Sequence, residues 1–377
     1  MSKKVTKGVT MTQDLDAWRQ EIRAIDNEII RITARRMELA LKIGKYKAEH
    51  QLPVKDFRVE KDIIERARLK AESLGLAPDF IEDLMTLLMG HSVNEQNKLH
   101  QAKAQEPDQG LKQVLIVGGL GRMGKWFSQY FLSIGYRVSI FDIKEENLPA
   151  SFLKHDHIEE DLDRYELILL ACPMKATADL LLKLAEKKPQ AMIIEMASLK
   201  SPVLEGIKAL QAQGLKIASI HPLFGPDTDL LLDKNILICT GPGLSSKEAA
   251  SLYFHSTSAN LVEVDLMTHD EDMLATLSLA HITNLMFGVT LSEQTIAMKD
   301  CQLKGGSTFL HQARTALAIF SENHDLYFDI QTLNPHGPKL FIDLQAALDR
   351  LRTQVETGDR MAFLKQMATT RDYLITP

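Results

Sequence analysis

Three glycines follow the apolar run "VLIV" in the first third of the chain. Gly119, Gly121 and Gly124 are spaced as GxGxxG, and a second apolar run, "RVSIFD", ends in Asp142. Glycines at this spacing allow a tight turn whose backbone amides approach a pyrophosphate, and an acid about 20 residues further on can bind ribose hydroxyls. The pattern predicts a dinucleotide-binding turn. The alternative is a glycine turn that holds no cofactor.

A second group of residues that could do chemistry is cationic and lies upstream. Arg36 stands where a heptad-like apolar pattern predicts an apolar side chain, and Lys47 returns to nearly the same helical face. Because a guanidinium is costly to bury alone, the two cations could converge on one anion. Arg19 points about 100° away and could reach that anion only from a second copy of the chain. Spacing alone favours a coiled coil with flanking charges.

These cations lie on a long predicted helix. Apolar residues recur at intervals of three and four from Leu15 to Tyr46, which predicts a helix from Leu15 to about Glu49. At about 1.5 Å per residue it would be about 50 Å long, so a second protomer is expected to cover it. Two further helices are predicted at about 57–73 and 78–100. The N-terminal unit is therefore predicted to be all helical.

The glycine turn lies in a predicted α/β unit. A helix is expected from about Met123 to Ile134, and the runs "ELILLACP", "AMIIEMAS", "KIASIHP", "NILICT" and "LVEVD" alternate with helices, as in a doubly wound parallel sheet. Ligands of such sheets bind beyond the carboxyl ends of the strands. Those ends carry Cys172 with Pro173, Ser198 and His221.

The expected fold is therefore multi-domain. An all-α domain at 1–100 precedes a polar linker at 101–110, an α/β Rossmann domain for NAD at 111–265 and an all-α dimerisation domain at 266–377. The last of these contains two long apolar-periodic helices and no alternation of strands.

Composition limits the possible functions. The net charge of −6 argues against nucleic-acid binding. The three cysteines, Cys172, Cys239 and Cys301, have no metal-ligand spacing, so we expect no metal and free thiols in a reduced compartment. No apolar run has the length of a signal peptide or a membrane span. We therefore expect a cytoplasmic protein without a membrane partner.

The first unit resembles the all-helical chorismate mutase family. The stretches "LDAWRQEIRAID", "ARRMELALKIGKYK", "PVKDFRVE" and "HSVNEQ" carry the resemblance over residues ~12 to 100, although Val59 stands where the family often has Arg. It implies the pericyclic rearrangement of chorismate to prephenate, which needs a compact conformer and complementary charge but no nucleophile. By resemblance, the substrate is held by the partner protomer's copy of Arg19 and by Arg36 at its carboxylates, by Lys47 and Gln96 at its ether oxygen, and by Asp56, Glu60 and Ser92 at hydroxyl and carboxylate groups.

The α/β unit resembles the prephenate dehydrogenase family in the stretches "IHPLFGPD" and "ASLKSP". The resemblance implies oxidation of prephenate by NAD with loss of carbon dioxide. His221 would accept the proton of the ring hydroxyl, Ser198 would support it, and Lys200 would help to set the charge of the site. His281 would face the cleft, with a place in the buried core as the alternative. The cofactor would contact Gly119, Leu120, Gly121, Arg122, Met123, Gly124, Asp142, Cys172 and Pro173.

The order of the units is similar to that of the bifunctional chorismate mutase/prephenate dehydrogenase family. This similarity implies chorismate and prephenate as substrates, NAD as cofactor and a homodimer. One family feature is missing, because Ala318 stands where the dehydrogenases usually carry a carboxylate-binding Arg, and we expect Arg314, one helical turn earlier, to replace it. Three alternatives remain open: the 4-amino-4-deoxy forms of both substrates, helices at the N-terminus that only dimerise or regulate, and a nucleotide sensor without turnover.

Overall fold

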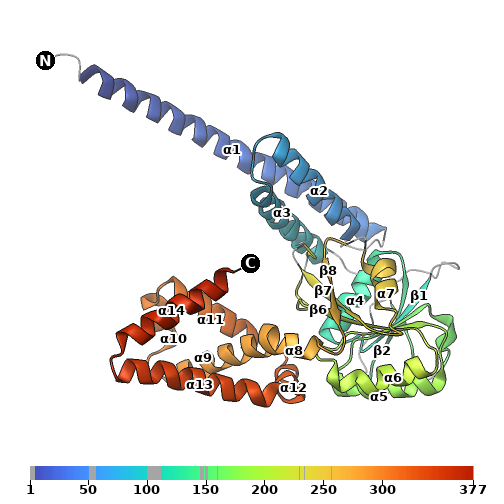
Figure 1. The fold of residues 1–377 in the computed structure, drawn as a ribbon. Helices are drawn as coiled ribbons and strands as arrows, with labels where there is room; N and C mark the ends of the chain where they lie inside the picture. Colours follow the sequence, from blue (N-terminus) through green and yellow to red (C-terminus); the bar gives the residue numbers. More distant parts are fainter. Residues whose placement is uncertain are drawn as a thin grey trace.

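The computed structural model describes residues 5–50, 57–99, 112–144, 148, 152–158, 160–228, 230–232, 234–255 and 257–376. Within these ranges the chain forms a helical N-terminal part, a central α/β sheet and a helical C-terminal part (Figure 1). This order confirms the predicted fold class. The expected linker at 101–110 lies outside the described residues, and the domain boundaries stay predictions.

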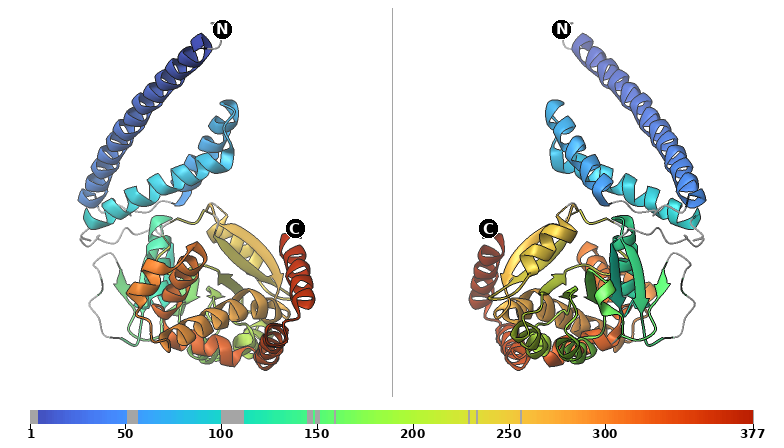
Figure 2. Two further views of the ribbon diagram at one scale, coloured as in Figure 1. Left: turned by 90° about the vertical axis from the view of Figure 1, so that its left-hand side faces the viewer. Right: turned by 90° about the vertical axis from the view of Figure 1, so that its right-hand side faces the viewer.

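The N-terminal part consists of α1 (Val5–Glu49), α2 (Phe57–Ser73) and α3 (Pro78–Leu99). Helix α1 begins at Val5 rather than at the predicted Leu15, because the stretch before Leu15 lacks the apolar stripe that periodicity detects, yet contains no proline to stop a helix. Figure 2 shows α1 projecting away from the sheet, with α2 and α3 between them. Its apolar seam is open to solvent in the single chain, and Trp18 is 61% exposed.

In the described residues the central sheet has eight strands, in the order β3-β2-β1-β4-β5-β6-β7-β8. Their bounds are β1 (Gln113–Val117), β2 (Arg137–Phe141), β3 (Leu153–Lys154), β4 (Leu167–Leu170), β5 (Met192–Glu195), β6 (Ile217–Pro222), β7 (Asn235–Thr240) and β8 (Asn260–Asp265). All neighbours are parallel except β6 and β7, which are antiparallel. The expectation of a wholly parallel sheet was therefore wrong. The described part of the connection at 223–234 contains no helix, whereas the crossover between parallel neighbours is usually helical.

Helices cover both faces of the sheet and fix its carboxyl edge. Helix α4 (Arg122–Ser133) lies on one face with α7 (Ser246–Ala249), while α5 (Met174–Lys187) and α6 (Leu204–Ala212) lie on the other (Figure 1). The α4 side chains pack with Phe254 against the sheet, where β4 and all of β1 except Gln113 are buried. Strands buried on both faces have continuous apolar sequences, and for this reason the apolar runs predicted the positions of these strands.

The C-terminal part is wholly helical in the described residues. It contains α8 (His269–Met273), a π-helical turn (Leu274–Leu279), α9 (Ala280–Ser292), α10 (Met298–Lys304), α11 (Ser307–Phe320), α12 (His324–Leu333), α13 (Gly337–Glu356) and α14 (Arg360–Ile375). The stretch His269–Ser292 is long and apolar enough to cross a membrane by length and composition, and 6% of its most apolar window is buried. Helix α9 packs against α11. Such an exposed apolar helix leaves a face that another chain could cover.

Candidate active sites

The glycine turn joins β1 to α4 at the carboxyl edge of the sheet. Gly118 has φ +79°, and a Cβ on Gly124 would lie 2.1 Å from the carbonyl oxygen of Gly118, so both positions require glycine. The amide of Leu120 donates to Asp142 Oδ2 at 2.9 Å, which ties the turn to the end of β2. The cradle left by these glycines fits the close approach of a dinucleotide pyrophosphate.

The other predicted cofactor residues surround this turn in different ways. Cys172 follows β4, and burial, with a smaller contribution from Asp142, raises the pKa of its thiol to about 12, so the thiol is neutral. Pro173 is the N-cap residue of α5. Met123 packs into the apolar cluster on the α4 face of the sheet. Its side chain therefore contributes to the core.

Arg122 forms a bridge across three parts of the chain. Its guanidinium pairs with Asp227, at 2.6 Å, on the connection from β6 to β7, and also with Glu322 after α11. The arginine of the glycine turn thus links the sheet to the C-terminal helices. Asp227 ends the stretch "IHPLFGPD" and Glu322 belongs to no motif, and neither was predicted to pair with Arg122.

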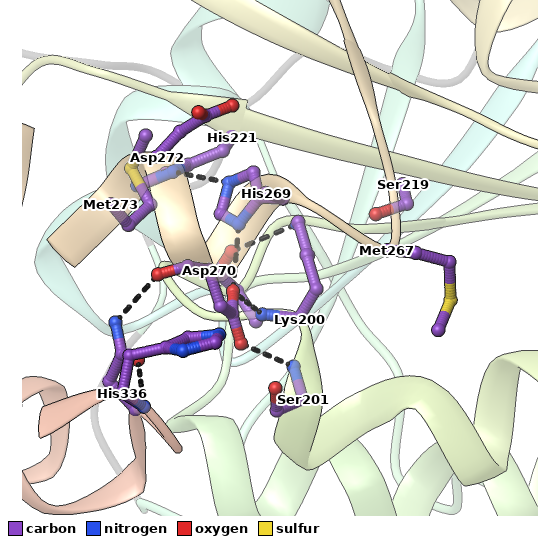
Figure 3. A network of polar contacts seen from close by, with 12 residues as sticks. Lys200, Ser201, Ser219, His221, Met267, His269, Asp270, Asp272, Met273 and His336 are labelled. Carbon is purple, nitrogen blue, oxygen red and sulfur yellow. Dashed lines mark hydrogen bonds and ion pairs between the residues drawn. The ribbon is translucent and has the colours of Figure 1, made fainter.

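His221 lies on β6, next to the carboxyl end of that strand. Its Nδ1 is 3.1 Å from His269 Nε2, and His269 Nδ1 is 2.8 Å from Asp270 Oδ1 (Figure 3). Burial lowers the pKa of His221 well below its usual 6.5, and the positive charge of Lys200 lowers it further. A neutral imidazole suits a proton acceptor at pH 7. His269 and Asp270 were not predicted for the site, because they lie in the C-terminal part, where the sequence predicted only apolar-periodic helices.

Lys200 lies beneath the strand ends. Its ammonium donates to Glu195 Oε1 at 2.8 Å and to the carbonyl oxygens of Ala197 and Ile220, and Ser219 donates to the same Glu195 carboxylate. The lysine is 1% exposed, and its positive charge acts on His221 by a coulombic interaction. Ser198 lies two residues before it, partly exposed, in the turn after β5.

His281 lies in the first turn of α9, 4.5 Å from the ring of Tyr327 between centroids. Burial lowers its pKa to about 4, which leaves it neutral. Among the described residues, His281 Nδ1, Ser278 Oγ and Gln331 Oε1 are buried without a hydrogen-bond partner. Buried polar atoms of this kind are what a bound ligand would satisfy.

Arg314 and Ala318 lie one turn apart on α11, and both are exposed. The role of Arg314 as the replacement for the missing arginine stays a prediction.

The helical N-terminal part brings two of its predicted site residues together. Arg36 donates to Ser92 Oγ at 2.7 Å and to the carbonyl oxygen of Leu88 at 2.8 Å, so α1 and α3 meet at this guanidinium. Lys47 is partly buried near the end of α1. Arg19 pairs with Asp16 on the projecting part of α1. Asp56 and the side chain of Gln96 lie outside the described residues.

Glu60 lies at the contact between α2 and the sheet. Its Oε1 accepts hydrogen bonds from the amides of Leu231 and Leu232, at 2.8 and 3.1 Å, and from Ser258 Oγ at 2.7 Å. The residue is 6% exposed. A residue predicted for the first site thus holds the connection between β6 and β7.

Comparison with known proteins finds relatives of both the helical N-terminal part and the rest of the chain. Residues 18–97 match the family model of chorismate mutase type II. The chain is 26% identical to the T-protein of Enterobacter agglomerans over 94% of the chain and 91% of that protein. It is 27% identical to the 4-amino-4-deoxyprephenate dehydrogenase of Streptomyces pristinaespiralis, over 69% of the chain and 90% of that protein. The fold resembles that of the prephenate dehydrogenase from A. aeolicus, solved with hydroxyphenyl propionate and NAD+, with TM-score 0.55 and 17% identity over 71% of this chain and all of the other.

Proposed function

Since the chain joins a type II chorismate mutase to a dehydrogenase of the prephenate dehydrogenase family, we propose that it converts chorismate to prephenate and then oxidises prephenate to 4-hydroxyphenylpyruvate with NAD. One observation carries the proposal: the Arg36–Ser92 pair and the His221 site occur in one chain, in the units that match these two families. These reactions belong to tyrosine biosynthesis.

The first reaction needs only binding and charge. Arg36, together with Lys47, supplies fixed positive charge on one side of α1, and Ser92 supplies a hydroxyl beside it. Such groups hold the compact conformer of chorismate and stabilise the charge that develops as one bond breaks and another forms. Arg36 would exchange its bond to Ser92 for a substrate carboxylate. Arg19 lies far along α1 and would serve the site of the partner protomer.

The second reaction needs a base beside the dinucleotide cradle. The strands β1 and β6 run in the same direction, so the glycine turn and His221 lie at the same edge of the sheet. The turn with Gly119, Gly121 and Gly124 would hold NAD, whose nicotinamide would supply the acceptor for the hydride that leaves the substrate ring. His221 accepts the hydroxyl proton as carbon dioxide leaves, and the aromatic product recovers a proton on its oxygen. Ser198 would hold the same hydroxyl, and His281, with its unpartnered nitrogen, would bind the substrate from the C-terminal helices.

The homodimer is part of this proposal. Arg19 can serve a site only in a second protomer, and the exposed seam of α1, with Trp18 and Ile22, offers the surface for it. Helix α9, where Met286 is 43% and Val289 50% exposed, offers a second surface. Mixing Arg19→Ala with Lys47→Ala protein should restore some mutase activity, because one site of each heterodimer would be intact. Absence of recovery after proven subunit exchange would exclude a shared site.

We also propose a cytoplasmic location. Cys172, Cys239 and Cys301 are all free thiols in the structure, as suits a reducing compartment.

A product analysis tests the proposal. Purified protein incubated with chorismate alone should yield prephenate, and addition of NAD should yield 4-hydroxyphenylpyruvate and NADH in equal amounts. The same assay with 4-amino-4-deoxyprephenate tests the substrate of the Streptomyces relative. If the enzyme prefers the amino compound, that compound rather than prephenate is its substrate. If the enzyme reduces NAD with prephenate but does not convert chorismate, the N-terminal helices are only a dimerisation or regulatory module.

A further inference from the structure

Two side chains behind His221 are not accounted for by its role as a base. His269 and Asp270 extend from His221 in a line, with 3.1 Å between the two imidazoles and 2.8 Å from the second imidazole to the carboxylate (Figure 3). His221 is 4% exposed, His269 0% and Asp270 4%, so bulk water does not replace these contacts. Both residues lie at the start of α8, which faces the end of β6.

Asp270 is rigidly held and carries a full negative charge. Its Oδ1 accepts from the amide of Lys200 and its Oδ2 from the amide of Ser201, both at 2.7 Å. Asn334 donates to its backbone carbonyl oxygen at 2.9 Å. The hydrogen bonds from His269, Lys200 and Ser201 outweigh the effect of burial and lower the pKa of Asp270 to about 2. The carboxylate is therefore a fixed acceptor without a proton of its own.

This acceptor determines where the protons on the two imidazoles lie. His269 Nδ1 must donate, because its partner Asp270 only accepts. Burial lowers the pKa of His269, so it carries a single proton and its Nε2 is an acceptor. His221 must then donate from Nδ1 to that nitrogen. The remaining nitrogen of His221, Nε2, is left with a free lone pair.

We infer that His269 and Asp270 are positioning residues of the dehydrogenase reaction, which hold His221 in the tautomer whose Nε2 accepts the substrate proton. When Nε2 takes that proton, His221 becomes a cation with its Nδ1 proton still donated to His269. The charge of Asp270 stabilises that cation through the intervening ring. Beside an apolar neighbour, the His221 imidazole would populate both neutral tautomers. Only the tautomer with its proton on Nδ1 can accept a proton at Nε2.

The surrounding charges make this support necessary. Lys200 and His269 disfavour a proton on His221, whereas Asp270 favours it. Glu195 pairs directly with the Lys200 ammonium. The negative charge of Asp270 therefore opposes burial and the Lys200 charge, both of which disfavour the protonated form of His221. The inference rests on the proposed dehydrogenase function and adds two residues to it.

Three variants test the inference on the full-length protein with prephenate and NAD. His269→Leu removes the acceptor for His221 Nδ1 and should lower kcat roughly tenfold to a hundredfold, with Kd for NAD unchanged. His269→Gln keeps an amide oxygen near the position of Nε2 and should recover most of that loss. Asp270→Asn should lower kcat and also move the acidic limb of the kcat/KM profile to lower pH, because the charge that favours a proton on His221 is gone. His311→Leu, an exposed histidine on α11, is the matched control.

The outcomes separate the inference from the proposed function. Wild-type protein that does not oxidise prephenate contradicts the proposed function. If the wild type is active and kcat of His269→Leu is unchanged, the inference is wrong. It is also wrong if His269→Leu and His269→Gln lose kcat equally and the acidic limb of Asp270→Asn does not move. The Kd for NAD and the Tm of the same samples report folding of the dehydrogenase unit. If His269→Leu does not fold, the test rests on the pH profiles of His269→Gln and Asp270→Asn. Two profiles identical to that of the wild type would overturn the inference.

Discussion

The Glu60 carboxylate of α2 accepts a hydrogen bond from the backbone amide of Leu231 at 2.8 Å. The same connection carries Asp227, which pairs with Arg122 of the glycine turn. Arg122 also pairs with Glu322 of the C-terminal part. A residue assigned by resemblance to the mutase thus contacts the segment that braces the dinucleotide cradle.

Glu60→Ala should therefore affect both activities. It leaves two backbone amides and the Ser258 hydroxyl without this acceptor, at a cost of roughly 1–3 kcal/mol for each unsatisfied buried group. We expect a lower Tm, weaker mutase activity and a KM for NAD raised several-fold in the assay with supplied prephenate. Glu65→Ala, on the exposed face of α2, serves as the control. Unchanged dehydrogenase constants and Tm would show that the contact has no energetic weight.

Arg36→Ala and Lys47→Ala should abolish mutase activity and leave the oxidation of supplied prephenate largely intact. Both side chains lie on α1, and Arg36 contacts α3 rather than the sheet. The measurement is the rate of chorismate loss beside NADH formation from prephenate. Arg35→Ala, exposed next to Arg36, is the matched control. Loss of both activities in folded protein would contradict two separate sites.

The enzyme should prefer NAD to NADP by at least about tenfold in kcat/KM, because the Asp142 carboxylate would repel a 2′-phosphate. Asp142 is fixed by the Leu120 amide and so cannot turn away freely. Asp142→Asn should narrow the preference, chiefly through KM. Comparable values for the two cofactors in the wild type would refute this reading of Asp142.

The pH profile should show a base that stays active in mild acid. Burial and Lys200 lower the pKa of His221 below 6.5, so the imidazole remains unprotonated as pH falls through that value. We expect kcat/KM for prephenate to decline only below pH 6.5, and His221→Asn to lose at least tenfold in kcat while still binding NAD. An acidic limb centred above 6.5, or an unchanged kcat in the variant, would remove the assigned role.

Arg314→Ala should raise KM for prephenate about tenfold or more, since a charge-assisted hydrogen bond contributes roughly 1.5–3 kcal/mol. Arg314 is exposed on α11, where a substrate carboxylate could reach it. Arg350→Ala, exposed on α13, is the control. If KM does not change, or if wild type prefers the 4-amino-4-deoxy substrate, Arg314 is not the replacement for the missing arginine.

The sequence by itself determined the elements and the local chemistry. Buried strands such as β1 and β4 are continuous apolar runs, helices α2 and α3 are marked by periodicity and by Pro78, and the glycine turn is a local motif whose steric demands are met within a few residues. The order of units and the positions of Arg36 and His221 were therefore available from the chain alone.

Only the tertiary structure decided which distant groups meet. Glu60 with Leu231 and His221 with His269 are pairs of residues far apart in sequence. The antiparallel pairing of β6 with β7 and the contact of buried Lys200 with Ile220 also depend on how separate elements pack. Hydrogen bonds and charge interactions depend on distances of a few ångströms, and spacing along the chain fixes such distances only within one helix or strand. The environment of His221 is for this reason a property of the fold.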